Sequence, residues 1–259
     1  MFPVLIKIGS FTIYTYGFLL AIGFLLALFL FEWNLKKAGL PVKELSNLVF
    51  YLFIVAFLGS KILMILVEYK YYITYPKEIL GSLRAGGHFF GALLFGIPFA
   101  LIYLKKKKIP FLPVSDVFAP SIALAHAFGR LGCFSAGCCY GREINCPISV
   151  TFTNPIAHQN TGVPLGVPLF PTQLAEAIFN FANFFFLFYL LKKKVKEGKV
   201  FSFYIFNYSI WRFLIEFFRG DPDRGIIFQK PFTFSVPQLI SIIGIIFSIF
   251  LFSYIKKKK

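Results

Sequence analysis

The feature that most constrains this chain is a series of apolar runs. Each is roughly 20 residues long, the length that a helix needs to cross a bilayer. Hydrophobic residues make up 58% of the 259 residues, above the roughly 45–50% of soluble domains. The runs cover about 11–32, 45–67, 88–104, 113–134, 172–191, 200–218 and 236–255. The sequence therefore predicts an all-α polytopic membrane protein with about seven transmembrane helices, forming one transmembrane domain over residues 1–259.

Lysine clusters predict the orientation of this domain. Four segments that follow alternate apolar runs (33–44, 105–112, 192–199 and the C-terminal tail) hold 16 of the 27 basic residues. Cytoplasmic loops are enriched in Lys and Arg, so with seven spans the N-terminus is expected outside and the C-terminus in the cytoplasm. Residues 1–9 lack the basic start of a signal peptide, and the first run is expected to remain as an anchor. Lysines grouped in this way, without a basic stripe carrying interleaved aromatics, argue against nucleic-acid binding despite the net charge of +16.

Three outer segments are expected between the spans. Residues 68–87 carry four tyrosines, typical of a membrane interface. Residues 135–171 are polar and proline-rich, which predicts a small extracytoplasmic cap with little helix. Residues 219–235 begin with a turn-rich Arg-Gly-Asp-Pro-Asp-Arg-Gly segment.

Arginine is scarce, with six residues against 21 lysines, and no arginine lies in a lysine cluster. A guanidinium at membrane depth costs about 2.5–3.5 kcal/mol even on the mildest scale. Arg212 lies inside a predicted span, and Glu216 follows one helical turn later on the same face. The pair is either a structural ion pair or part of a phosphate clamp, to which Arg219 could contribute, because a guanidinium binds phosphate bidentately.

The end of the fourth run combines titratable and small residues. His126 and Arg130 are four residues apart, so they share a helix face. Four glycines recur in the same segment and allow close backbone approach or sharp turns: Gly129, Gly132, Gly137 and Gly141. A hydrogen-bonded interior histidine remains an equally good explanation of His126.

All four cysteines fall within fourteen residues of this segment: Cys133, Cys138, Cys139 and Cys146. A disulfide is possible in an oxidising outer compartment, and reactive thiols are possible too. The spacing matches no standard zinc pattern and no histidine is interleaved. We therefore expect no metal site.

A further glycine-rich segment precedes the third run. It contains Arg84, Gly86, Gly87 and His88. Paired glycines at this point would let the backbone approach a ligand. His88 would lie at the interface, where a neutral imidazole tolerates partial burial.

In combination these motifs resemble the bacterial prolipoprotein diacylglyceryl transferases over nearly the whole chain. The matching segments are Tyr16-Gly17, Arg84 to Ala92, Asp116-x-x-Ala-Pro120, Gly129-Arg130-x-Gly132 with Gly137 and Gly141, Pro171-Thr172-Gln173-Leu174 with Glu176, Arg212-x-x-x-Glu216-Phe217-Phe218-Arg219, and Gln238 to Ser241. Each is weak alone, and their shared order carries the resemblance.

The resemblance implies an inner-membrane enzyme of lipoprotein biosynthesis that requires no metal and no organic cofactor. Its substrates would be phosphatidylglycerol and the lipobox cysteine in the signal peptide of a prolipoprotein, and its products a thioether and glycerol phosphate. Arg130 and Arg212 would be the essential cations, with Glu216 and Arg219 as their partners. Substrate-binding positions would be Tyr16, Gly86, Gly87, Gly129, Gly132, Gly137, Gly141, Gln173, Glu216 and Arg219.

The sequence departs from the family pattern at three positions. Cys133 and Cys138 stand where better-known members of the family have an Asn and a Glu. Phe90 lies near the position at which those members have a catalytic His or a Tyr. Phe can neither accept a proton nor hydrogen-bond phosphate. We therefore assign the catalytic base to His126, which lies one turn from Arg130, or as the second choice to His88. Two alternatives remain: a same-fold enzyme with another lipid or acceptor that uses the cysteines, and a membrane protein that binds or transports phospholipid without chemistry.

Overall fold

The computed structural model describes residues 2–9, 11–82, 87–222, 225–228 and 234–257. The chain divides into two compact units. Unit 1 comprises residues 1–34 and 115–259, and unit 2 comprises residues 35–114. Each unit is described by itself.

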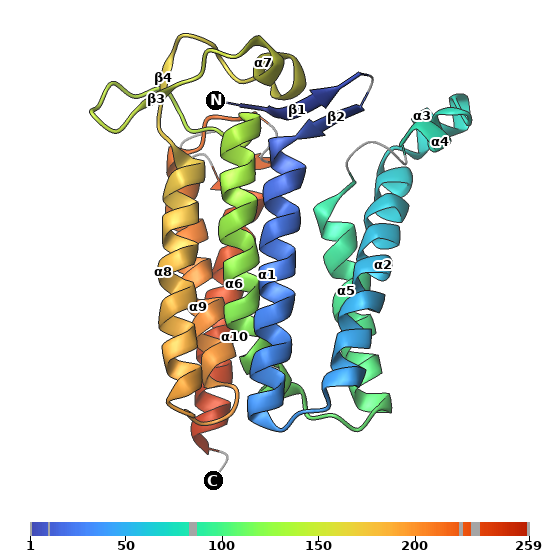
Figure 1. The fold of residues 1–259 in the computed structure, drawn as a ribbon, viewed down its shortest axis with the longest axis vertical. Coiled ribbons are helices and arrows are strands. Elements are labelled where there is room, and N and C mark those ends of the chain that lie inside the picture. The colour runs from blue at the N-terminus through green and yellow to red at the C-terminus, as the bar shows by residue number, and fades with distance from the viewer. Residues whose placement is uncertain (1, 10, 83–86, 223–224, 229–233, 258–259) are drawn as a thin grey trace. The chain divides into compact units, whose positions relative to one another are not determined.

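Unit 1 is a bundle of long helices that run alongside one another (Figure 1). They are α1 (Thr15–Ala38), α6 (Phe111–Ala136), α8 (Thr172–Lys192), α9 (Lys199–Ile215) and α10 (Val236–Lys257). The last four residues of α1 and the first four of α6 belong to unit 2. Ala119 and Ala123 of α6 pack with Leu187 of α8 and Val200 of α9. The alanines allow three helices to meet closely at this level of the bundle.

A buried carboxylate fixes one end of this bundle. Asp116 of α6 accepts hydrogen bonds from the backbone N–H groups of Gly198 at 2.6 Å and Phe201 at 2.8 Å. These donors belong to the N-terminus of α9, where the first N–H groups lack partners within the helix. Asp116 therefore caps a helix that follows it by more than eighty residues and holds α6 against α9.

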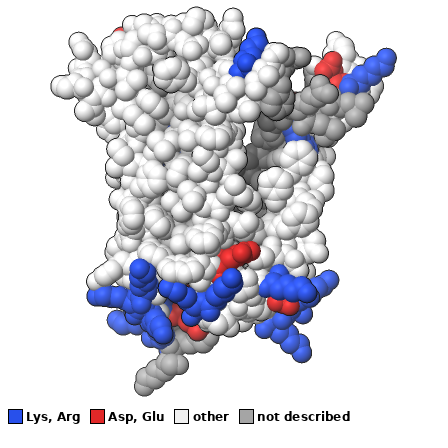
Figure 2. Space-filling model, viewed as in Figure 1, with Lys and Arg blue, Asp and Glu red and all other residues white. Residues whose placement is uncertain are grey.

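Lysine side chains of unit 1 gather at this same end. The segment 192–199 joins α8 to α9 there, and α10 finishes with Lys256 and Lys257 in its last turn. Figure 2 shows Lys and Arg side chains collected where the C-terminus lies. Cationic residues at helix C-termini also interact favourably with the helix dipole.

The other end of unit 1 carries short strands. A hairpin precedes α1, formed by β1 (Val4–Ile8) and β2 (Phe11–Tyr14). The predicted first span at 11–32 was therefore wrong at its start, since residues 11–14 pair as a strand. The β-branched and aromatic residues of Phe-Thr-Ile-Tyr suit a strand, and pairing with β1 satisfies the backbone groups of this segment.

The segment expected as a cap folds around a small apolar core of its own. It contains β3 (Val150–Thr151), α7 (Pro155–Thr161) and β4 (Pro168–Leu169), with β3 and β4 antiparallel. The core comprises Tyr140, Phe152, Ala157, Val163 and Leu169. After α9 follow the 3₁₀ turn η1 (Glu216–Phe218) and the strands β5 (Ile226–Phe228) and β6 (Phe234–Ser235). The principal helix within residues 135–171 is α7, which has seven residues. The segment therefore contains little helix, as the sequence predicts.

Unit 2 is built on two long helices, α2 (Val42–Val67) and α5 (Phe89–Lys106), with short α3 (Tyr69–Thr74) and α4 (Glu78–Ser82) between them. Gly59 of α2 and Gly91 of α5 lie in direct contact, and a Cβ on Gly91 would overlap the carbonyl of Gly59. Small residues at such a crossing let two membrane helices approach closely.

All seven predicted runs contain a helix, and five of these helices are long and apolar enough to cross a bilayer: α1, α2, α6, α8 and α10. The chain is therefore a mostly helical, multi-pass membrane protein. Helices α5 and α9, with 18 and 17 residues, are not among those five helices in the part of the chain that the structure describes. A count of seven spans stays a prediction.

Candidate functional site

Two arginines from different helices of unit 1 converge on one buried carboxylate. Glu176 of α8 is 2% exposed. Its Oε2 pairs with Nε of Arg130 from α6, and its Oε1 accepts from Nη1 of Arg212 on α9 at 3.2 Å. The charge of Glu176 offsets the cost of placing two guanidiniums within the bundle. Three helices thus bring the two arginines together.

A second carboxylate completes the cluster. Glu216, at the start of η1, pairs through Oε2 with Nη2 of Arg212 at 2.9 Å, as the i,i+4 spacing predicted. The two arginine side chains are each 14% exposed, whereas both glutamates are almost fully buried. Two positive and two negative groups leave the cluster neutral overall, and its more accessible members are the cations. An anion approaching this cluster would therefore meet guanidinium groups first.

His126 orients Arg130. One helical turn before it on α6, His126 accepts through Nε2 a hydrogen bond from Nε of Arg130 at 3.2 Å. The imidazole ring lies 5.2 Å from that of Tyr208 on α9. Arg130 also interacts with the side chain of Tyr208, and a guanidinium carries five N–H donors, so Arg130 retains donors for a further anion.

The chain turns sharply where α6 ends. Gly137 has φ of 85°, and a Cβ there would crowd Val163 and Ala157 of the segment 135–171. Cys139 has φ of 60°, a left-handed conformation that is uncommon for residues other than glycine. These two residues reverse the backbone just beyond α6, as expected for Gly137.

The first turn of α8 holds this reversal in place. The hydroxyl of Thr172 donates to the carbonyl of Cys139 at 2.7 Å, and Nε2 of Gln173 donates to the carbonyl of Cys138 at 2.8 Å. Both side chains are buried. Gln173, expected at a substrate site, therefore positions the turn that carries the cysteines.

Gly141 lies beside Arg219, a contact that the order of the two residues in the sequence does not predict. They form an isolated antiparallel bridge, and a Cβ on Gly141 would overlap the carbonyl of Phe170. Arg219 is itself clamped by Asp221, with Nε to Oδ1 at 2.6 Å and Nη2 to Oδ2 at 2.5 Å. The hydrogen bond and charge of Asp221 raise the pKa of Arg219 even though burial opposes the charged form. Arg219 thus stays a cation beside the turn.

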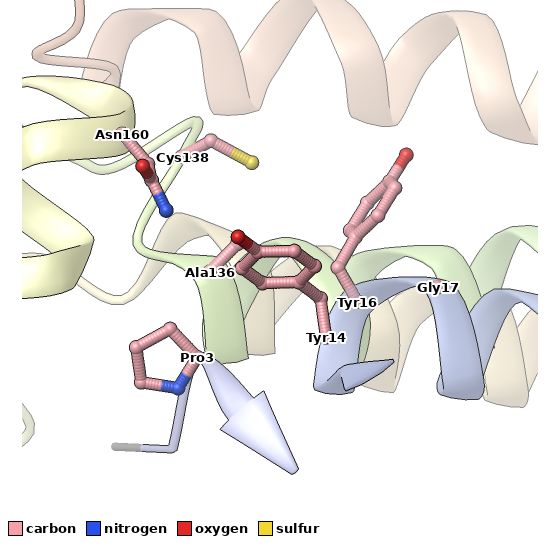
Figure 3. A pocket seen from close by; sticks show the side chains of 7 residues that line it. All are labelled: Pro3, Tyr14, Tyr16, Gly17, Ala136, Cys138 and Asn160. Atoms are coloured by element: carbon pink, nitrogen blue, oxygen red, sulfur yellow. The ribbon is translucent and has the colours of Figure 1, made fainter. Parts of the chain in front are cut away.

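Tyr16 lies at the start of α1, against Gly132 of α6. A Cβ on Gly132 would stand 3.1 Å from the Tyr16 ring, whereas one on Gly129 would meet only Leu20, at 3.9 Å. Gly132 therefore permits the approach of Tyr16, and Gly129 is less constrained. Beside Tyr16 opens an apolar pocket of about 360 Å³ (Figure 3), lined by Pro3, Tyr14, Tyr16, Gly17, Ala136, Cys138 and Asn160.

Other predicted site residues belong to unit 2 or lie outside the described residues. His88 precedes α5, where its backbone N–H donates to the carbonyl of Ser60 at 3.2 Å and its Nε2 lies 4.0 Å from Glu68. A Cβ on Gly87 would contact Ser60. Gly86 and Arg84 fall outside the described residues. The role of His88 as a base stays a prediction.

Sequence reasoning missed Glu176 as a site residue, although the motif around it was noted. The signal was present, because a carboxylate within an apolar span is costly unless a cation pairs with it. It also missed the tight grouping of Cys133, Cys138 and Cys139, whose sulfur atoms all lie within 4.8 Å of one another. That grouping arises from the reversal at Gly137, which spacing in the sequence does not reveal.

The fold and the site together define a class: a multi-pass membrane protein with paired arginines held on a carboxylate inside its helix bundle. Such a site is suited to bind the anionic headgroup of a lipid. A family model described as prolipoprotein diacylglyceryl transferase matches residues 3–254. The chain belongs to this family of bacterial membrane proteins.

Curated relatives agree over the full length. The chain is 40% identical over 260 residues to the phosphatidylglycerol–prolipoprotein diacylglyceryl transferase of Clostridium tetani, covering all of both chains. It is 36% identical over 255 residues to the second such transferase of Clostridium perfringens, covering 98% of this chain and 96% of the relative. It is also 36% identical to that of Clostridium botulinum, over all of this chain and 99% of the relative.

Proposed function

We propose that this chain transfers the diacylglyceryl group of phosphatidylglycerol to the lipobox cysteine of a prolipoprotein, a step of lipoprotein maturation. The observation that carries the proposal is the convergence of Arg130 and Arg212 on Glu176. Full-length relatives bear the name of this activity, and two guanidiniums at one point within an apolar bundle suit a lipid phosphate.

The chemistry follows from where charge develops. The substrate thiol loses its proton, and its sulfur forms a bond to the glyceryl carbon. The bond between that carbon and the phosphate oxygen breaks, and its electron pair leaves with glycerol phosphate, which carries one more negative charge than the diester. Donors aimed at developing charge stabilise a transition state more than a ground state. In this proposal Arg130 and Arg212 bind the phosphate.

Glu176 and Glu216 hold the arginines for this task. Each guanidinium is fixed by a carboxylate before lipid binds, so little reorganisation is needed during the reaction. His126 contributes by accepting from Arg130. If His126 also acts as the base, its Nε2 must exchange the N–H of Arg130 for the substrate proton.

The same proposal includes the topology. The chain would form one transmembrane domain of seven spans, with the N-terminus outside, the C-terminus in the cytoplasm and residues 135–171 as an outer cap. In this topology the arginine cluster would lie nearer the outer face of the bacterial inner membrane. The lysine clusters support this orientation, since those of unit 1 lie at the end opposite the short strands and α7 (Figures 1 and 2).

The test uses purified full-length protein with phosphatidylglycerol vesicles and a peptide that contains a lipobox cysteine. Mass spectrometry should show the gain of one diacylglyceryl group, with none on a peptide carrying serine instead. The Arg130→Lys and Arg212→Lys variants should lose most of this activity, because an ammonium cannot bind phosphate bidentately. A cysteine peptide that stays unmodified by the folded protein would contradict the proposal.

A further inference from the structure

The thiols of Cys133, Cys138 and Cys139 form a cluster that the arginine chemistry does not use. Their sulfur atoms lie within 4.8 Å of one another, and all three side chains are only partly exposed. A tetrahedral zinc ion bound to sulfur at about 2.3 Å separates its ligands by about 3.8 Å. Three thiols at this spacing need only small side-chain adjustments to share one ion.

The backbone is built to hold the three thiols together. Gly137 and Cys139 both adopt left-handed conformations, which return Cys138 and Cys139 toward Cys133 at the end of α6. Thr172 and Gln173 of α8 then fix the carbonyls of Cys139 and Cys138. Strained, doubly anchored backbone of this kind is common at functional sites, and support by surrounding residues orients metal ligands.

Two cations lie near this cluster. Arg219 and Arg130 both lie close enough to Cys139 to interact with it electrostatically. Three thiolates on Zn²⁺ carry one net negative charge, which neighbouring guanidiniums would compensate. Thiolate groups are soft ligands that select zinc among the common divalent ions of cells.

Three protein ligands leave a fourth position of the tetrahedron open, as in catalytic zinc sites. Cys138 also lines the apolar pocket beside Tyr16, so a molecule in that pocket would lie beside one thiol of the cluster (Figure 3). The pocket walls suit the apolar side chains of a membrane-inserted peptide. A peptide thiol entering there would be an additional sulfur ligand of the kind already present.

We propose that Cys133, Cys138 and Cys139 bind one Zn²⁺ ion whose open position takes the cysteine thiol of the prolipoprotein. The identity of the fourth ligand rests on the proposed function, whereas the metal site does not. This inference revises the sequence-based expectation of no metal.

Zinc in this position would supply the nucleophile. Coordination deprotonates a thiol, and the released proton passes to solvent. The zinc-bound sulfur then attacks the glyceryl carbon while the carbon–oxygen bond to phosphate breaks, and the electron pair leaves with glycerol phosphate. The neutral thioether is a poor ligand and departs. A strong protein base is then unnecessary.

The first experiment measures the metal in full-length protein purified in detergent without chelators. One zinc per chain is expected by elemental analysis. Cys133→Ser, Cys138→Ser and Cys139→Ser should each lower the zinc content by more than about 100-fold, because loss of a ligand should cost more than loss of an outer-shell partner. Cys146→Ser is the matched control and should keep its zinc, because Cys146 lies outside the cluster.

A second measurement avoids reliance on variants that fold poorly. Wild-type protein stripped of metal and loaded with Co²⁺ should show the sulfur-to-cobalt charge-transfer and tetrahedral visible bands of a thiolate site. Absence of both zinc and these bands from folded protein would overturn the metal site. Detection by mass spectrometry of a disulfide between two of the three cysteines in the active protein would also overturn it.

The open position is tested on the cobalt-loaded protein. A lipobox peptide with cysteine should shift the visible bands, and the same peptide with serine should not. Unchanged bands with the cysteine peptide would overturn the fourth-ligand assignment. Diacylglyceryl transfer without metal would defeat this inference and leave the proposed function standing, whereas metal binding without transfer would defeat the function and leave the zinc site.

Discussion

Two buried carboxylates of unit 1 differ in what they bind, and the difference separates architecture from chemistry. Asp116 accepts two backbone N–H groups of α9 and links α6 to α9 at the lysine-rich end. Glu176 accepts two guanidiniums, from α6 and α9, nearer the other end. Backbone donors are used up when they cap a helix, whereas guanidiniums keep further donors. One carboxylate therefore only holds helices together, while the other also presents cations to a ligand.

The largest expected effect comes from removing one of those cations. Arg130→Gln and Arg212→Gln should each lower the rate of diacylglyceryl transfer by about 100- to 1000-fold or more, because a charged donor to the phosphate is lost. The rate is measured by mass spectrometry of a lipobox peptide. Asp116→Asn, at the other carboxylate, is the matched control and should keep activity per folded molecule within about twofold. Equal losses of transfer rate in the arginine variants and in Asp116→Asn would show that the two carboxylates do not differ in this way.

Neutralising the shared carboxylate should damage both stability and chemistry. Glu176→Gln leaves two guanidiniums in the bundle with less negative charge, and breaking a buried ion pair costs about 3–5 kcal/mol. We expect a marked fall in the thermal unfolding midpoint in detergent, together with reduced transfer. Glu143→Gln in the cap is a control on an exposed carboxylate and should leave the midpoint unchanged. A Glu176→Gln protein as stable as the wild type would argue that the arginines do not depend on it.

The role of His126 can be sharpened with one substitution. His126→Gln keeps an acceptor for Nε of Arg130 but removes a base. If orientation is the role of His126, transfer should fall by less than about tenfold, whereas loss of a general base costs about 100- to 10,000-fold. His126→Leu removes both functions and should be worse than His126→Gln. Full activity of His126→Gln, with Arg130→Gln inactive, would rule out His126 as the base.

The capping carboxylate should affect stability more than rate. Asp116→Asn weakens the bonds to Gly198 and Phe201 because the amide has one acceptor oxygen and no charge. Loss of a helix cap costs about 0.5–2 kcal/mol. The expected readout is a lower unfolding midpoint with the transfer rate of the folded fraction nearly unchanged. A rate that falls far more than stability would place Asp116 in the reaction.

The smallest effect is expected from a pair of glycines on the same helix. Gly132→Ala would push against Tyr16 at 3.1 Å, so we expect a loss of transfer of a few-fold, of the order that overpacking by about 1–3 kcal/mol produces. Gly129→Ala, with its nearest atom at 3.9 Å, should be neutral or slightly stabilising because alanine favours helix. Assays of both variants with phosphatidylglycerol would separate these outcomes. Equal behaviour would show that Tyr16 needs no close approach to α6.

Much of this architecture could be predicted, because hydrophobic length is read directly along the chain. The seven apolar runs all contain helices, and the Arg212–Glu216 pair formed at its predicted spacing. Local periodicity determines both features. The start of the first span was wrong because the pairing of β2 with β1 depends on a partner segment that an apolar run does not reveal.

By itself the sequence determined that this chain is a membrane protein, which residues lie within apolar helices, and that its arginines are costly there. Only the tertiary structure decided that Glu176 joins Arg130 to Arg212, that Asp116 caps α9, and that three cysteines meet beyond Gly137. Hydropathy and helical period are properties of neighbouring residues. Partners that lie tens of residues apart are chosen by packing and by the need of each buried charge to find a counter-charge or donor.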